Sequence, residues 1–384
     1  MLDPEFKRNI TRGIEKITWE LQDELIKVLV KELTENETFS QTTILKLLQA
    51  NEAGILYKKI IPIVAKTTKK SQREIKQAFE KAKIKQAEYD AEIYGHKVKL
   101  SVPMAAIIQA QYEMTLGEFR NYTRSTAQAA CKSYFTALDR AYNQTVGGLK
   151  SWNQAFMDAV DEIGAGVKIT YDSGYKTSPE VAVARSLRTG IAQMASQITA
   201  TRAVQNDVHL FLTSAHDGAR PTHEPWQGQV FWVDWKELAR RIPVDLPDEI
   251  PEATDEEKKK YKEFCVTTEI GDVQGLEGAN CRHSYGPFFE GSTNPYEGKV
   301  YDQSKYDKEQ KARAMERNIR KWKQKYTGQK TAYDNMSKGT LKDQEKVRME
   351  STRQKLNDKI KAYYDYCNAN EIKTPQEFRL YISK

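Results

Sequence analysis

Apolar side chains recur at intervals of three and four positions through most of the first 165 residues. This spacing places them on one face of a helix. The helices predicted in this way cover about residues 5–34, 71–93, 103–145 and 152–164. Ser71 with Glu74 matches a capping box that would begin the second of these helices, and Ser151 would cap the last one. The N-terminal region is therefore expected to be helical.

Between residues 166 and 300 the pattern changes to short alternations of apolar and polar positions, which are typical of strands. The predicted strands cover residues 167–171, 208–212 and 229–232. A helix is expected from Pro179 to about residue 206, because Ser178 and Pro179 match an N-cap and a first helical position. The charged, proline-containing segment 244–263 is expected to be a surface excursion.

From about residue 301 the pattern is helical again but very polar. Gly328 and Gly339 are expected to interrupt the helices, and residues 351–368 form the last clear one. The predicted fold class is thus α+β and predominantly α. It comprises three regions: a helical N-terminal region (1–165), a small α/β domain (166–300) and a basic helical C-terminal region (301–384).

The composition narrows the class of protein. The chain of 384 residues is 39% hydrophobic and 29% charged, and no stretch approaches the roughly 20 consecutive apolar residues of a membrane helix. Residues 1–9 lack the apolar core of a signal peptide, so neither a membrane segment nor Sec-dependent export is expected. The cysteines are widely spaced and are expected to be free thiols: Cys131, Cys265, Cys281 and Cys367.

The charge is unevenly distributed. The net charge is +7, yet residues 301–384 contain 21 Lys and Arg against 12 Asp and Glu, so the preceding 300 residues are slightly acidic. A solvated helix is one interpretation of the densest stretch, residues 305–330; the other is contact with DNA phosphates without reading of sequence. The residues predicted to make such contacts are Lys311, Arg313, Arg317, Arg320, Lys321, Lys323 and Lys325.

Two segments rich in Gly, Pro and Asn carry most of the histidines. The first motif segment (214–231) reads SAHDGARPTHEPWQGQVF, and the second motif segment (275–291) reads GLEGANCRHSYGPFFEG. Together with ITYDSGYKTSPEVAVARSLRTGI at 169–191 and EQKARAMERNIRKWKQK at 309–325, they resemble the phage minor capsid protein 2 family. That family is related to head-morphogenesis proteins of the phage Mu head-protein F type.

The specific resemblance covers about residues 165–330. The residues that carry the family motifs are His216, Asp217, Arg220, His223, Trp226, Gln227, Gly228, Gly275, Gly278, Asn280, Cys281, Arg282 and His283. The chain departs from the wider pattern at His283, where many relatives have a second cysteine, and in the length of segment 244–263.

The resemblance implies a structural minor capsid protein of a tailed-phage or prophage head, present in few copies near the portal vertex and acting in head morphogenesis. The implied partners are the portal protein, other capsid proteins and packaged double-stranded DNA; a low-copy oligomer would fit. The implied location is the virion, in the head interior or at the portal vertex, and the host cytoplasm during assembly. No catalytic residue is expected.

Four side chains in the two motif segments are ligands that zinc accepts: His216, His223, Cys281 and His283. If the segments face each other, these side chains could close one tetrahedral site. The alternative is a hydrogen-bonded loop pair in which Asn280 and the imidazoles bind backbone groups. No other cofactor is expected.

Catalysis is a further alternative for the motif segments. Asp217, Arg220 and His223 are spaced at three residues, so Asp217 and Arg220 could form an ion pair, or His223 could act as a general base beside a phosphate-binding Arg220. The second function hypothesis is therefore a metal-dependent nuclease or toxin-like enzyme carried in the head. A third is a free DNA-binding protein of the host.

Aromatic residues follow the first motif closely. They either form the core of the small α/β domain or present a patch to a partner. The residues concerned are Trp226, Phe231, Trp232 and Trp235.

Overall fold

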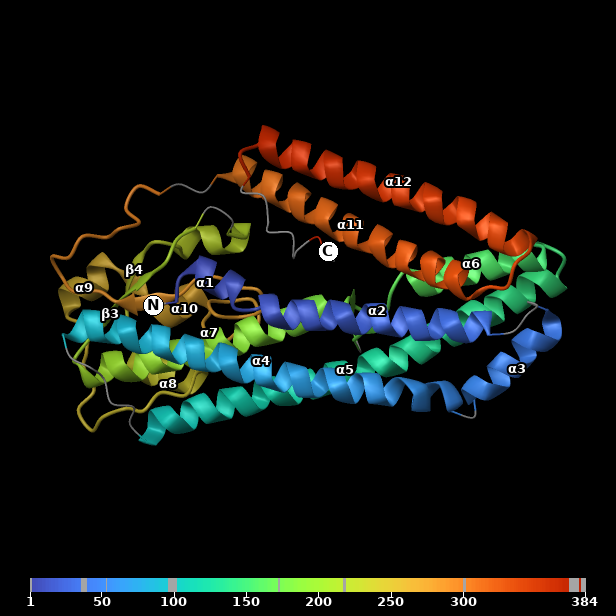
Figure 1. The fold of residues 1–384 in the computed structure, drawn as a ribbon. Coiled ribbons are helices and arrows are strands. Elements are labelled where there is room, and N and C mark those ends of the chain that lie inside the picture. Colours follow the sequence, from blue (N-terminus) through green and yellow to red (C-terminus); the bar gives the residue numbers. More distant parts are fainter. Residues whose placement is uncertain are drawn as a thin grey trace. The chain divides into compact units, whose positions relative to one another are not determined.

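The computed structural model describes residues 2–35, 40–52, 54–95, 102–171, 173–216, 219–299, 302–372 and 380. Most of these residues are helical, and the strands are few and short (Figure 1). The predicted α+β, predominantly α class is confirmed. None of the helices described is long and apolar enough to cross a membrane.

The helices of the first half are α1 (Pro4–Asn9), α2 (Arg12–Thr34), α3 (Gln41–Glu52), α4 (Ile55–Tyr94), α5 (Val102–Val146) and α6 (Trp152–Gly164). They are followed by strands β1 (Ile169–Thr170) and β2 (Lys176–Thr177), helix α7 (Pro179–Gln205), strand β3 (Leu210–Thr213), the 3-10 helix η1 (Pro221–Trp226) and strand β4 (Val230–Trp232). The remaining elements are α8 (Trp235–Arg241), α9 (Asp255–Lys260), β5 (Lys262–Glu263), α10 (Phe264–Thr268), β6 (Tyr285–Pro287), α11 (Gln303–Asn335) and α12 (Thr340–Ala369).

The chain forms two compact units, each assembled from separated segments. Unit 1 comprises Met1–Ile14, Gln72–Phe119 and Val183–Asp307, and unit 2 comprises Glu15–Ser71, Arg120–Ala182 and Lys308–Lys384. Both units draw on the N-terminal helical region as well as on later parts of the chain. The division into three sequential regions stays a prediction.

Unit 1 contains a four-stranded sheet in the order β5-β4-β3-β6. β3 pairs antiparallel with β4 and β6, whereas β5 runs parallel to β4. The rings of Phe211, Trp235, Phe264 and Tyr285 pack against one another in a core beside this sheet, with centroids 4.7–5.5 Å apart around Phe211. Burial of these large aromatic side chains stabilises the sheet, whose strands are short.

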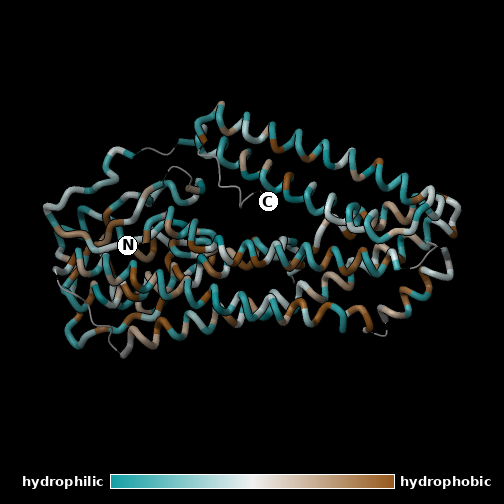
Figure 2. The backbone as a smooth tube through the Cα atoms, viewed as in Figure 1, coloured by the Kyte–Doolittle hydropathy of each residue, from teal (hydrophilic) through white to brown (hydrophobic). Residues whose placement is uncertain are grey.

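Among the residues that the structure describes, the regular elements of unit 2 are helices apart from the two-stranded β1–β2 ribbon. Its main core collects apolar residues of α2, α3, α4, α5 and α6. A second, smaller core lies between α11 and α12, which run side by side (Figure 1). Both of these helices are largely hydrophilic, with apolar residues only at intervals (Figure 2). The narrow apolar stripe leaves most of their surface polar.

Several predicted helix ends are confirmed, and two expected features are wrong. Ser151 caps α6 by accepting a hydrogen bond from the backbone N–H of Gln154. Ser71, in contrast, does not begin a helix: it is buried within α4 and donates to the carbonyl of Thr67 at 2.8 Å. Burial of an apolar stripe along α4 outweighs the local capping signal.

Gly328 does not interrupt a helix either, because it lies buried inside α11. A Cβ atom at this position would stand 3.2 Å from Cα of Gly164 on α6, and one at Gly164 would stand 3.3 Å from Cα of Lys325. The two glycines allow α6 and α11 to cross at close range. Gly339 does precede a helix, α12, as expected.

Segment 244–263 is more than the expected surface excursion. Its last residues form β5, which extends the sheet beside β4. Thr254 and Glu257 form a capping box on α9, and the carboxylate of Glu257 also bonds Nε2 of His209 at 2.9 Å. These contacts anchor the C-terminal end of the segment to unit 1.

Candidate metal centre

The first motif segment turns through η1 before it enters β4. Arg220 occupies the N-cap position with an extended backbone, and Pro221 takes the first position of η1, where its missing N–H costs nothing. His223 and Trp226, which are both buried, lie one turn apart on η1. The 3-10 helix therefore carries His223 into the interior of unit 1.

The second motif segment approaches β6 through tight turns that depend on its glycines. A Cβ atom on Gly275 would lie 1.9 Å from the carbonyl oxygen of Glu269, and one on Gly278 would lie 2.4 Å from that of Val273. Glu277 and Asn280 adopt positive φ angles of 60° and 61°, which asparagine tolerates better than most residues. This backbone brings Cys281 and His283 beneath η1.

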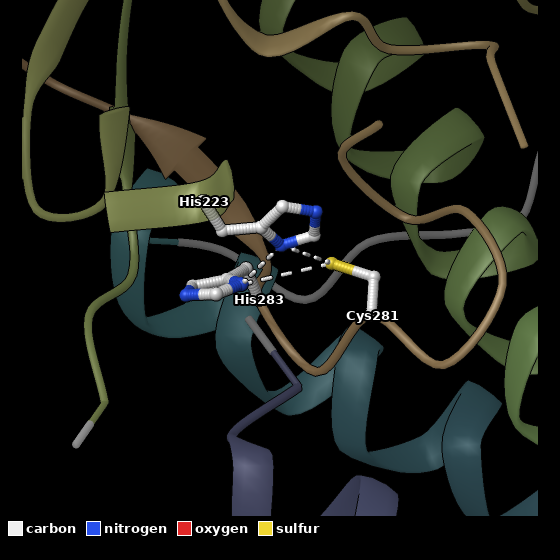
Figure 3. A group of neighbouring side chains, drawn as sticks. All are labelled: His223, Cys281 and His283. Atoms are coloured by element: carbon white, nitrogen blue, oxygen red, sulfur yellow. Dashed lines mark hydrogen bonds between the residues drawn. The ribbon is translucent and has the colours of Figure 1, made fainter. Parts of the chain in front are cut away.

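Three of the predicted ligands converge (Figure 3). The Nδ1 atoms of His223 and His283 lie 3.3 Å apart, and the sulfur of Cys281 lies 3.8 Å and 3.7 Å from them, respectively. Tetrahedral zinc, with bonds of about 2.0–2.1 Å to nitrogen and about 2.3 Å to sulfur, separates two nitrogens by about 3.3 Å and a nitrogen and a sulfur by about 3.6 Å. The spacing of the three atoms is thus that of one zinc coordination sphere.

The outer ring nitrogens of both histidines are fixed by hydrogen bonds. Nε2 of His223 donates to the carbonyl of Gln274 at 2.9 Å, since a carbonyl can only accept. Oε1 of Gln227 accepts from the backbone N–H of His216 at 3.2 Å, so Nε2 of His283, also at 3.2 Å from it, must be the donor. Both Nδ1 atoms therefore present lone pairs to each other and to the thiol.

The surroundings keep these imidazoles neutral. His223, Cys281 and His283 expose only 2%, 3% and 1% of their surfaces. Burial lowers the pKa of His223 to about 4 and lowers that of His283 well below its usual value. Burial also raises the pKa of the Cys281 thiol. Neutral imidazoles are ligands ready for a metal, whereas the thiol would have to lose its proton to a bound cation.

His216 lies against the cluster without joining it. Its ring stacks on that of His283, with centroids 4.3 Å apart and planes at 25°, so it presents a face rather than a nitrogen. Trp226 covers another side, with its ring centroid 4.5 Å from His223 and 4.8 Å from His283. The structure therefore assembles three of the four predicted metal ligands.

The other motif residues support the two loops. Arg220 donates through Nη2 to the carbonyl of Ala279, which joins the first motif segment to the second. Asp217, its predicted ion-pair partner, lies outside the described residues. Gly228 has a φ of +67°, and a Cβ there would meet Tyr296 at 2.9 Å. Arg282 is half-buried beside the ligands.

The hydrogen-bonding role considered for Asn280 stays a prediction. Its side chain is exposed, and the structure places the residue in the left-handed region at a turn. Of the aromatic residues near the first motif, three are buried in the core of unit 1: Trp226, Phe231 and Trp235. Trp232 is half-buried, with the ammonium of Lys258 over its ring.

A buried ion pair that no sequence pattern indicates lies next to the cluster. Lys7 of α1 donates to Oε2 of Glu277 at 2.7 Å and to the carbonyl of His283 at 2.6 Å. Lys7 is fully buried and Glu277 nearly so. Burial raises the pKa of Glu277, while the ammonium of Lys7 lowers it. More than 260 residues separate the two in sequence, so only the fold reveals this tether of α1 to the second motif segment.

The residues predicted to bind DNA divide into two groups in unit 2. Lys311, Arg317 and Lys321 are exposed. The other four interact with protein groups: Arg313 with Glu309, Lys325 with Asp161, Arg320 with the ring of Trp19, and Lys323 in a pocket that also contains Asp23. Burial lowers the pKa of Lys323 to about 8. Some of the basic side chains in this stretch therefore contact groups of unit 2 itself.

Comparison with known proteins gives one finding. The model of a family described as phage minor capsid protein 2 matches residues 2–361, which is nearly the whole chain. Neither the search of curated proteins nor that of solved structures returned a match.

Proposed function

Because the chain belongs to the phage minor capsid protein 2 family, we propose that it is a structural component of a tailed-phage or prophage head, held in few copies near the portal vertex. Its partners are the portal protein, other capsid proteins and the packaged DNA. The proposed location, in the phage head or at its portal vertex, rests on the same family membership.

A cluster of lysines on α11 and α12 supports the contact with DNA. The ammonium groups of Lys325, Lys355 and Lys359 lie 5.6, 5.8 and 5.2 Å from the centre of the Trp322 ring. Of these, Lys325 is paired with Asp161. Lys355 and Lys359 have no ion pair within the part of the chain that the structure describes. Two lysines without a carboxylate partner, one turn apart on a helix, suit the phosphates of a DNA backbone.

The surface of α11 extends this basic character. Three of its basic residues are exposed: Lys311, Arg317 and Lys321. Like Lys355 and Lys359, they form no ion pair with the residues that the structure describes. Lys311 lies over the ring of Tyr366 at 4.7 Å. Such contacts bind phosphate without reading bases, which suits a protein that meets DNA of any sequence inside a head.

Burial of the motif histidines argues against the nuclease alternative. A general base must come within hydrogen-bonding reach of its substrate, yet His223 and His283 expose at most 2% of their surfaces. Trp226 and His216 cover the rings. The proposal therefore assigns His223 and His283 to the interior of unit 1 and no catalytic step to the chain.

The salt dependence of DNA binding by the purified full chain tests this proposal. Each lysine that contacts a phosphate contributes about 1 to the slope of log K against log salt. Lys355→Gln combined with Lys359→Gln should reduce the slope by about 2 and weaken binding to unrelated duplexes equally.

The matched control removes the same charge at ion-paired positions. Lys83→Gln with Lys330→Gln, whose lysines pair with Glu80 and Asp334, should leave the slope nearly unchanged. Equal losses in both double variants would mean that net charge alone drives binding and would overturn the assignment of the surface. The absence of binding by the unaltered chain would overturn the DNA contact itself.

A further inference from the structure

The two histidines and the cysteine at the centre of unit 1 are left in an unfavourable arrangement without a cation. The lone pairs of both Nδ1 atoms face each other at 3.3 Å, and the thiol of Cys281 carries only one hydrogen to donate. One acceptor in this buried cluster would then remain unsatisfied, which costs about 1–3 kcal/mol. Protonation of one Nδ1 atom would supply a second donor, but it would place a positive charge on a buried imidazole.

We propose that His223, Cys281 and His283 bind a zinc ion through Nδ1, Sγ and Nδ1, and that this ion joins η1 to the second motif segment. The ligand set carries the choice of metal. Two imidazoles and one thiolate are the donors that zinc accepts in tetrahedral sites, whereas magnesium and calcium require oxygen. The separations of the three atoms fit one such sphere.

The groups around the ligands fit the same assignment. Metal-bound histidines usually donate their other ring nitrogen to a carbonyl or carboxylate, which fixes the ring. His223 does so to Gln274, and His283 does so to Gln227. Lys7 binds the carbonyl of His283 itself, so the centre also depends on the position of α1.

The function of the ion is structural. The ligands lie on one short 3-10 helix and on the turns that precede β6, and the sheet beside them has only short strands. A metal that binds the folded chain but not the unfolded chain stabilises the fold by the free energy of metal binding. This inference does not depend on contact with DNA or with the portal.

Metal analysis of the tag-free, full-length protein tests the inference. We expect about one zinc per chain after gel filtration, lost about tenfold or more in Cys281→Ala and in His283→Ala. His283→Cys, which keeps a zinc ligand at that position, should retain the metal even where His283→Ala fails to fold.

Matched controls in the same unit are Cys265→Ala and His209→Ala, since Cys265 is buried and His209 bonds Glu257. Both should keep their zinc. Cobalt substituted for zinc should give a sulfur-to-metal charge-transfer band that is absent from Cys281→Ala and present in Cys265→Ala.

Removal of the metal by a chelator should lower the midpoint of thermal unfolding, and added zinc should restore it. The inference is overturned if the folded chain contains no zinc and gains no thermal stability when zinc is added. It is also overturned if the metal content is the same in Cys281→Ala, His283→Ala and the two control variants.

Discussion

The motif segments of unit 1 and the basic helices α11 and α12 of unit 2 both contain residues chosen from the sequence for their chemistry, but the fold uses them differently. In unit 1, three ligands from positions 60 residues apart meet in the interior. In unit 2, residues from one continuous basic stretch separate, some outward and some into ion pairs. A motif specifies a three-dimensional arrangement, whereas an excess of charge specifies only a composition.

The difference extends to the way each region handles buried charge. Unit 1 buries the ion pair of Lys7 with Glu277, in which the ammonium of Lys7 also binds a backbone carbonyl. Unit 2 spreads charge over a network in which Asp161 accepts from Lys325, Gln329 and Arg348. A fully buried pair depends on both partners, whereas a network at the edge of solvent tolerates the loss of one better.

Lys7→Met should have the largest effect on stability. It leaves the carboxylate of Glu277 buried without its partner, so the free energy of opening of unit 1 should fall by about 3–5 kcal/mol. Hydrogen exchange of the β3 and β6 amides measures this loss. The second substitution Glu277→Gln in the same chain should recover part of it.

The matched control is Lys70→Met, because the pair of Lys70 with Glu20 is largely exposed. Its effect should stay below about 1 kcal/mol. If the two lysine variants lose the same free energy, the tether of α1 to the second motif segment does not stabilise unit 1.

Asp161→Asn should have a smaller effect, confined to unit 2. The amide retains one acceptor for Lys325, Gln329 and Arg348 but loses the charge, so the free energy of opening of the α11 amides should fall by about 1–2 kcal/mol. DNA affinity should not decrease, since Lys325 is released rather than removed. A loss of DNA binding would contradict the separation between internal and outward basic residues; Asp334→Asn, whose pair with Lys330 is exposed, is the control.

Glu345 gives unit 2 a pH dependence of the opposite sign to that of an ordinary ion-paired carboxylate. Burial raises its pKa to about 7 from 4.5, so the folded state takes up a proton between these values and stability falls as pH rises through this window. Glu345→Gln should flatten this dependence and raise the free energy of unfolding at pH 8 by on the order of 1 kcal/mol.

Denaturant unfolding of the unaltered chain and of Glu345→Gln at pH 5 and pH 8 measures this change in the free energy of unfolding. Glu350→Gln on the exposed side of the same helix serves as the control. A steeper pH dependence in Glu345→Gln than in the unaltered chain would show that Arg348 holds Glu345 ionised.

Much of the local structure could be predicted from the sequence, because helix periodicity and caps such as Ser151 are local signals. Ser71 and Gly328 were misleading, since burial against other helices overrides a local cap or a glycine. The candidate ligands were recognisable by residue type, but their convergence was not. Lys7 could not have been identified, because nothing near it in sequence differs from an ordinary amphipathic helix.

The central claim is that Lys355 and Lys359 of α12 contact DNA, while the buried histidines of the motif segments take no part in that contact. Ultraviolet cross-linking of purified phage particles, followed by mass spectrometry of peptide–nucleotide adducts, tests it most directly. The account predicts that the chain is present in the particle and that adducts occur on peptides containing Lys355 and Lys359. Adducts concentrated on residues 219–231 or 275–291, or the absence of the chain from the particle, would contradict it.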